Sequence, residues 1–123
     1  AGRLVRWPKR LGKERAKLHL GHTVRMQEEI GTGGGGFRFM YAAFLQESAK
    51  ELQSQTLADS AALFTEAGDR WRQFAVMAAR VCKNRALPED TYPAMAERIM
   101  SCADLEKEVF LKLRDWLKRE AAV

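Results

Sequence analysis

The sequence contains no long hydrophobic run, only three prolines and only two cysteines. No stretch approaches the run of about 18 apolar residues that is typical of a membrane-spanning helix, and no signal peptide is evident. Cys82 and Cys102 each stand among apolar residues, which favours buried free thiols in a reducing cytoplasm. A disulfide between the two cysteines is the alternative. We therefore expect a cytoplasmic protein.

Length and composition favour one globular helical domain spanning residues 1–123. A chain of 123 residues is long enough for one hydrophobic core, and 46% hydrophobic with 30% charged residues is a globular balance. Alanine, leucine, glutamate, lysine and arginine are plentiful, and this mix favours helix. Nothing in the sequence has the pattern of a β-strand.

The net charge of +5 lies entirely within residues 1–30, because the remaining residues carry equal numbers of basic and acidic groups. We expect residues 1–10 (AGRLVRWPKR) to form a short basic arm interrupted by Pro8. The arm is either a solvated surface or a contact for an acidic protein partner. Nucleic acid is the weakest of the candidate partners, since Trp7 is the arm's one aromatic residue and no recognition-helix motif is apparent.

Apolar residues at helical spacing predict four helices, over residues 11–30, 37–54, 57–85 and 93–119. Gly21 weakens the first helix and is a candidate break, and Gly31 is a candidate C-terminal cap. Asp90 or Thr91 is expected to cap the last helix, after a loop over residues 87–93. The expected buried faces are Leu11, Leu18, Val24 or Met26, and Ile30 in the first helix; Phe37, Met40, Tyr41, Phe44, Leu45, Ala49 and Leu52 in the second; Leu57, Ala61, Phe64, Gly68, Trp71, Phe74 or Ala75, Ala78 and Cys82 in the third; and Met95, Ile99, Cys102, Leu105 or Glu106, Val109, Leu113 and Trp116 in the fourth.

These patterns predict an all-α, up-and-down helical bundle of three long helices plus an N-terminal helix, with a Gly-rich loop before the second helix. Gly68 and the many alanines of the third helix indicate a close approach between helices.

The Gly-rich loop is the most unusual stretch of the chain. Residues 31–36 hold five of the nine glycines, and an apolar helical pattern follows at once. Gly31, Gly33 and Gly36 match G-x-G-x-x-G, but a helical pattern and not a strand precedes them, and no Lys-Ser/Thr follows as in a P-loop. Backbone N–H groups at a helix N-terminus suit an anion, and Arg38 would add charge. A flexible connection without a ligand is the alternative.

Other candidate chemistry in the sequence is weak. His19 and His22 lack the third or fourth ligand that zinc requires, and both cysteines fall within apolar stripes, where thiols are usually inert. Asp69 and Arg72 lie three positions apart, either as a surface pair or as the lining of a cleft. We expect no catalytic residue, no metal and no cofactor.

The string GTGGGGFRFMYAAFLQE at residues 31–47, with Ala67-Gly68-Asp69-Arg70-Trp71 further on, resembles the C-terminal helical domain of the butirosin biosynthesis protein H family. The resemblance spans about residues 5–120. Proteins of that family join an N-terminal papain-like domain to a helical C-terminal domain, and their type member transfers an acyl group from an acyl carrier protein to an aminoglycoside.

The resemblance implies that this chain is the C-terminal part of a larger protein and is inactive by itself, because the family's nucleophilic cysteine and histidine belong to the papain-like domain. Its partners would be that missing domain and an acyl carrier protein, with homo-oligomers as a further option. The Gly-rich loop and the next helix would pack near the acyl-donor or acceptor pocket. The candidate binding residues are then Thr32, Gly33, Gly34, Gly35, Gly36, Arg38 and Tyr41. A stand-alone interaction or oligomerisation module remains the alternative.

Overall fold

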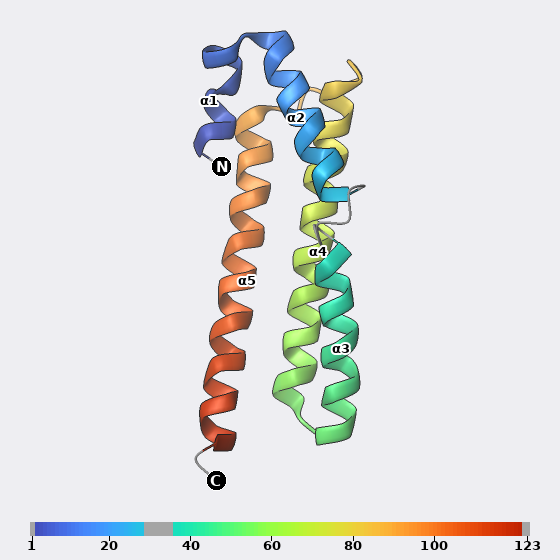
Figure 1. Ribbon diagram of the computed structural model, residues 1–123, viewed down its shortest axis with the longest axis vertical. Coiled ribbons are helices and arrows are strands. Elements are labelled where there is room, and N and C mark those ends of the chain that lie inside the picture. The colour runs from blue at the N-terminus through green and yellow to red at the C-terminus, as the bar shows by residue number, and fades with distance from the viewer. Residues whose placement is uncertain (1, 29–35, 122–123) are drawn as a thin grey trace.

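The computed structural model describes residues 2–28 and 36–121, which form five α-helices and no strand (Figure 1). The all-α prediction is confirmed, although the N-terminal part holds two helices where the sequence predicted one. The helices are α1 (Gly2–Leu11), α2 (Lys13–Glu28), α3 (Gly36–Leu52), α4 (Gln55–Cys82) and α5 (Tyr92–Ala121).

Pro8 does not interrupt the basic arm at residues 1–10 as expected, because α1 is helical and continues through this residue. Proline cannot donate the backbone hydrogen bond of a helix interior, so packing must stabilise this helix. Leu4 is buried and Trp7 is half-buried on the core side, one turn apart, while the arginines and lysines of α1 are exposed. Tertiary burial of one face therefore outweighs the local penalty of Pro8.

The helix break lies at Gly12 and not at Gly21. Gly12 has a φ of 83°, in the left-handed region that favours glycine, and its carbonyl accepts the first hydrogen bond of α2 from the Ala16 N–H. Gly21 lies inside α2, where a Cβ atom would come 3.3 Å from the sulfur of Cys82. Gly21 thus allows α2 to lie close to α4.

α4 is the central element of the fold, because α2, α3 and α5 all pack against it. Figure 1 shows α4 and α5 as two long antiparallel helices, with α2 beside the C-terminal half of α4 and α3 beside its N-terminal half. α1 closes one end by packing on α2 and α5. α2 and α3 together therefore cover α4 along its length, as a third long helix would.

Two helix boundaries depend on side-chain caps. Ser54 was expected to end α3, but it precedes α4 as its N-cap and accepts a hydrogen bond from the Leu57 N–H at 3.3 Å. Thr91 caps α5, because its hydroxyl accepts from the Ala94 N–H at 3.2 Å. Of the two predicted candidates for that cap, Asp90 has a different role that is described below. α4 ends at Cys82, three residues before the predicted end.

The core consists of two clusters along α4. The cluster near the N-terminal helices contains Leu4, Leu20, Phe74, Met77, Ala78, Val81, Met95 and Ala96, and the cluster near the free end contains Ala42, Leu45, Leu57, Ala61, Phe64 and Val109. The buried faces predicted for the third and fourth helices agree with these clusters, since their apolar stripes are long and regular.

The buried faces predicted for the first two helices are largely wrong. Ala16 and Leu20 are buried in α2, whereas Leu18 is 73% exposed. In α3 the buried residues are Ala42 and Leu45, while most of the predicted stripe is exposed: Phe37, Met40, Tyr41, Phe44 and Leu52. α3 carries apolar side chains on more than one side, so periodicity alone does not select the side that faces α4.

Candidate functional site

Most of the predicted anion-binding loop lies outside the described residues, which exclude Thr32, Gly33, Gly34 and Gly35. Gly36 is the first residue of α3, and Arg38 and Tyr41 lie in its first two turns. The loop's role as an anion site stays a prediction. The structure does define where Arg38 and Tyr41 place their side chains.

Arg38 connects three helices. Its guanidinium forms an ion pair with the Glu106 carboxylate of α5, and its Cζ atom lies 4.5 Å from the ring centroid of Trp71 in α4. The same carboxylate accepts a hydrogen bond of 3.0 Å from the indole N–H of Trp71. Both charged side chains are about one-fifth exposed, so the pair is shielded from water on most sides. The charge of Arg38 is thus engaged within the domain.

A second contact between α3 and α4 depends on Gly68. A Cβ atom at this position would lie 2.7 Å from the ring of Phe39, closer than side chains pack. The Arg72 guanidinium also lies near that ring, with its Cζ atom 5.0 Å from the ring centroid. The close helix approach predicted at Gly68 is therefore confirmed, and its partner is an aromatic ring of α3.

The exposed side of α3 carries an aromatic face, which we define as Phe37, Met40, Tyr41 and Phe44. These residues are three and four positions apart, so they form one stripe on the helix surface. The Tyr41 ring lies 4.9 Å from that of Phe37 and 6.4 Å from that of Phe44. Beneath the stripe, Tyr41 stacks at 5.6 Å on the buried ring of Phe64. The three rings of this face are thus connected through Tyr41, which also links them to the core.

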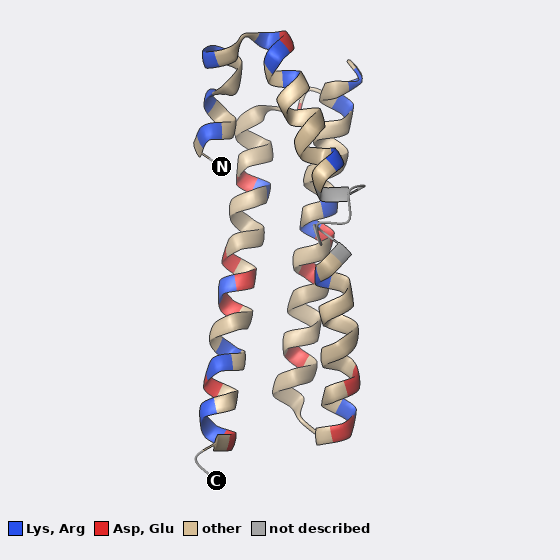
Figure 2. Ribbon diagram, viewed as in Figure 1, with Lys and Arg blue, Asp and Glu red and all other residues tan. Residues whose placement is uncertain are grey.

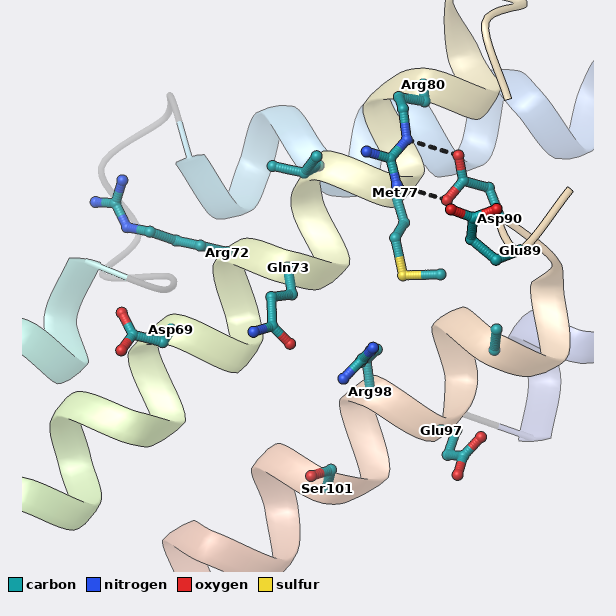
Figure 3. A pocket seen from close by; sticks show the side chains of 12 residues that line it. Asp69, Arg72, Gln73, Met77, Arg80, Glu89, Asp90, Glu97, Arg98 and Ser101 are labelled. Carbon is teal, nitrogen blue, oxygen red and sulfur yellow. Dashed lines mark hydrogen bonds and ion pairs between the residues drawn. The ribbon is translucent and has the colours of Figure 1, made fainter. Parts of the chain in front are cut away.

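An open cleft of about 860 Å³ lies between α4 and α5, on the segment nearest the α4–α5 loop (Figure 3). Asp69 and Arg72, which the sequence left as either a surface pair or cleft-lining residues, line this cleft, and no ion pair joins them in the described chain. Figure 3 shows Gln73 of α4 and Arg98 of α5 extending into the opening. Its walls thus carry charges of both signs.

The Arg80–Asp90 pair forms one end of this cleft. Nε and Nη2 of Arg80 each donate to a different oxygen of the Asp90 carboxylate, both at 2.6 Å. The Leu87 N–H donates to the same carboxylate at 2.8 Å. The bond from Arg80 and, next, the bond from Leu87 hold the pKa of Asp90 below its usual range against the opposing effect of burial. Asp90 therefore fastens the loop to α4.

The cleft offers charged and polar groups for binding. Its one hydroxyl group belongs to Ser101, which accepts a hydrogen bond from Arg70, and neither described histidine lines the cleft. A nucleophilic serine requires a base within hydrogen-bond reach. Among the described residues no hydrogen bond joins the Ser101 hydroxyl to a carboxylate of the cleft, and the charged groups present suit electrostatic contacts.

The two thiols are free and act as hydrogen-bond donors. Cys82 Sγ donates to the Lys17 carbonyl at 3.3 Å, and Cys102 Sγ donates to the Ala67 carbonyl at 3.7 Å. Burial raises the pKa of the Cys82 thiol, and burial followed by the nearby Glu106 charge raises the pKa of Cys102 to about 11. Both thiols are therefore protonated near neutral pH, which is the unreactive form.

The histidines of H-x-x-H have separate surroundings. The His19 ring lies 5.8 Å from that of Trp7, while His22 is exposed on α2 and lines a groove between α2 and α4 that is described below. Within residues 2–28 and 36–121, no three His, Cys, Asp or Glu side chains gather as a metal site would require. Over the same residues, no helix is both long and apolar enough to cross a membrane.

Glu106 is a site residue that the sequence offered only as an alternative to Leu105. The only available signal was a carboxylate at a position where the apolar stripe of α5 offers either Leu105 or Glu106. A charge on a buried face usually has a partner, but its partner lies 68 residues away and no local pattern identifies it.

Comparison with known proteins identifies a family but not an activity. No curated protein and no solved structure matches the chain. The sequence profile of one family, a domain of unknown function named DUF4872, matches residues 1–113, which include α1 to α4 and most of α5. The chain therefore belongs to the DUF4872 family of domains of unknown function.

Proposed function

We propose that this chain is a non-catalytic helical accessory domain of a cysteine-type acyltransferase or amide-bond-forming enzyme. In this proposal the aromatic face of α3 and the Gly-rich loop before it pack against a papain-like catalytic domain, near the pocket for the acyl donor or acceptor. The observation that carries the proposal is the aromatic face. Its members are 40% to 71% exposed although their rings are connected to the core.

An aromatic stripe of this kind has the composition of an interface core. Contiguous exposed apolar side chains are uncommon on soluble monomers, and aromatic residues and methionine are enriched where proteins meet. Ion pairing of Arg38 and stacking of Tyr41 hold the helix in one orientation. A preorganised face loses little conformational entropy when a partner binds.

The resemblance to the butirosin biosynthesis protein H family supplies the identity of the proposed partner. The string that carries it, residues 31–47, contains the Gly-rich loop and the whole aromatic face. An interface role for this stretch accounts for both features together. The loop, with Thr32 and the glycines that follow, would then lie beside the acyl donor delivered by an acyl carrier protein.

The protonated state of both thiols agrees with acyl transfer by a different domain. An acyl-transferring cysteine needs a thiolate or an adjacent base, and both Cys82 and Cys102 are held as protonated donors to backbone carbonyls. We therefore propose that the nucleophile belongs to the partner domain.

The test is reconstitution from separate polypeptides. This chain and the papain-like domain of a butirosin biosynthesis protein H-like enzyme would be purified apart, and their binding measured by calorimetry. We expect saturable binding, and about tenfold or greater weakening by Phe44→Glu, because a buried charge is costly at an interface core. Leu117→Glu is the matched control, since Leu117 is equally exposed (60% against 64%) but lies near the end of α5.

Acyl transfer from an acyl carrier protein thioester provides the second readout. Adding this chain should raise the rate of the catalytic domain, and Phe44→Glu should reduce that gain. Equal binding of the catalytic domain by Phe44→Glu and Leu117→Glu would contradict the proposal, as would acyl transfer by this chain alone. Self-association that Phe44→Glu abolishes, with no binding of the catalytic domain, would favour an oligomerisation module instead.

A further inference from the structure

A groove of about 600 Å³ runs between α2 and the C-terminal end of α4. Its floor is apolar or small, and its rim is polar and mainly basic. The floor consists of Leu18, Gly21, Val24, Ala79 and Cys82, and the rim of Glu14, Lys17, His22, Arg25, Lys83 and Asn84.

The shape of the groove results from two small residues. Gly21 allows α2 to lie close to α4, since a Cβ atom there would come 3.3 Å from the Cys82 sulfur, and Ala79 adds only a methyl group to the lining. Leu18 is 73% exposed, the largest exposed fraction among the large hydrophobic side chains that the structure describes. The groove therefore presents an apolar strip to solvent.

Basic side chains surround this strip. Lys17 is held in place by a hydrogen bond to Asn84 and an ion pair of 3.8 Å with Glu14. Lys83 is exposed at the end of α4. The rest of this end of the molecule is also basic, as Figure 2 shows for α1 and the start of α2. The exposed lysines and arginines there are Arg3, Arg6, Lys9, Arg10, Lys13 and Arg15.

We propose that this groove binds an acidic amphipathic helix of a protein partner. Apolar residues on one side of such a helix would cover Leu18 and Val24, and its carboxylates would face Lys83 and the basic end of the domain. The lining of α2 from Glu14 to Arg25 covers eleven residue steps, about 16 Å. This length accommodates a docked helix of about three turns, as in other helix-in-groove complexes.

The apolar floor distinguishes this partner from other polyanions. A nucleic acid would pair its phosphates with the basic rim but would leave Leu18 without an apolar contact. A membrane surface would require an apolar helix side that is free to insert. In α1 that side is occupied, because Leu4 is buried and Trp7 packs against the core and against His19.

This inference is independent of the proposed function. It concerns α2 and the C-terminal end of α4, whereas the proposed interface with a catalytic domain lies on α3. Variants at Leu18 and at Phe44 therefore test the two proposals separately.

The experiment uses a fluorescent synthetic peptide of about 18 residues, with leucine on one helical side and glutamate on the other. Fluorescence anisotropy should show saturable binding to the full chain that weakens as salt is added. A scrambled peptide of the same composition, which cannot form an apolar side, should bind about tenfold more weakly or not at all.

Variants locate the binding site. Leu18→Glu and Lys83→Glu should each weaken binding about tenfold, while Leu117→Glu and Lys112→Glu, exposed positions near the other end of the molecule, should leave it unchanged. Circular dichroism checks that each variant is folded. Equal binding of the scrambled peptide would overturn the proposal. So would tighter binding to a DNA duplex or to phosphatidylglycerol vesicles, or binding that Leu18→Glu does not weaken.

Discussion

The guanidinium of Arg38 in α3 forms an ion pair with the carboxylate of Glu106 in α5, 68 residues further along the chain. α3 and α5 lie on α4, and this pair joins them over the Trp71 indole that both groups contact. The pair therefore fixes the orientation of α3, and with it the direction in which the aromatic face points.

A double-mutant cycle should detect this coupling. Arg38→Gln leaves the Glu106 carboxylate partly buried without its positively charged partner, so we expect a loss of about 1–3 kcal/mol in the free energy of unfolding. Glu106→Gln keeps an acceptor for Trp71 and should cost less. Urea denaturation of both single variants and the double variant should give a coupling of about 1 kcal/mol. Strictly additive losses would show that the ion pair contributes nothing.

Gly68→Ala should destabilise the domain by about 1–3 kcal/mol, although alanine favours helix. The added Cβ atom would lie 2.7 Å from the Phe39 ring, so α3 would have to shift away from α4. Replacing Phe39 with leucine removes the ring. In that background Gly68→Ala should cost clearly less, as measured by thermal or urea unfolding. An equal cost in both backgrounds would locate the strain elsewhere.

The Arg80–Asp90 pair should make stability depend on pH in the acid range. Because the pKa of Asp90 is lower in the folded chain than its ordinary value of 3.8, the pair's contribution is fully present above that value. It is lost as the pH falls through the folded pKa. Asp90→Asn removes this contribution, so the difference in unfolding free energy between wild type and variant should shrink from pH 6 to pH 3. A difference that stays constant over this range would contradict the assignment.

Alkylation should distinguish the two thiols. Cys102 is fully buried with a pKa raised to about 11, so iodoacetamide at pH 7.5 should modify it only when the domain unfolds. Cys82 is partly exposed and should react faster than Cys102 but more slowly than a free cysteine. Mass spectrometry of quenched samples, with and without urea, gives both rates. Rapid labelling of Cys102 in the folded chain would contradict its burial.

The sequence by itself determined the helical class and the buried sides of α4 and α5. Both helices carry long, regular apolar stripes with one clear hydrophobic side, such as the run from Met95 to Val109. Over 28 and 30 residues, a regular period leaves one orientation that buries the stripe. Gly68 also signalled a close helix contact correctly.

The N-terminal helices and the orientation of α3 were decided only by tertiary structure. α1 is a helix despite Pro8 because Leu4 and Trp7 can be buried on the core. α3 turns Ala42 and Leu45 inward, where they join the buried cluster along α4 and α5. The ion pair between Arg38 and Glu106 was equally unpredictable, because the two residues are 68 positions apart in the sequence. Local propensity and periodicity cannot weigh such contacts, because their free energy comes from residues that only the folded chain brings together.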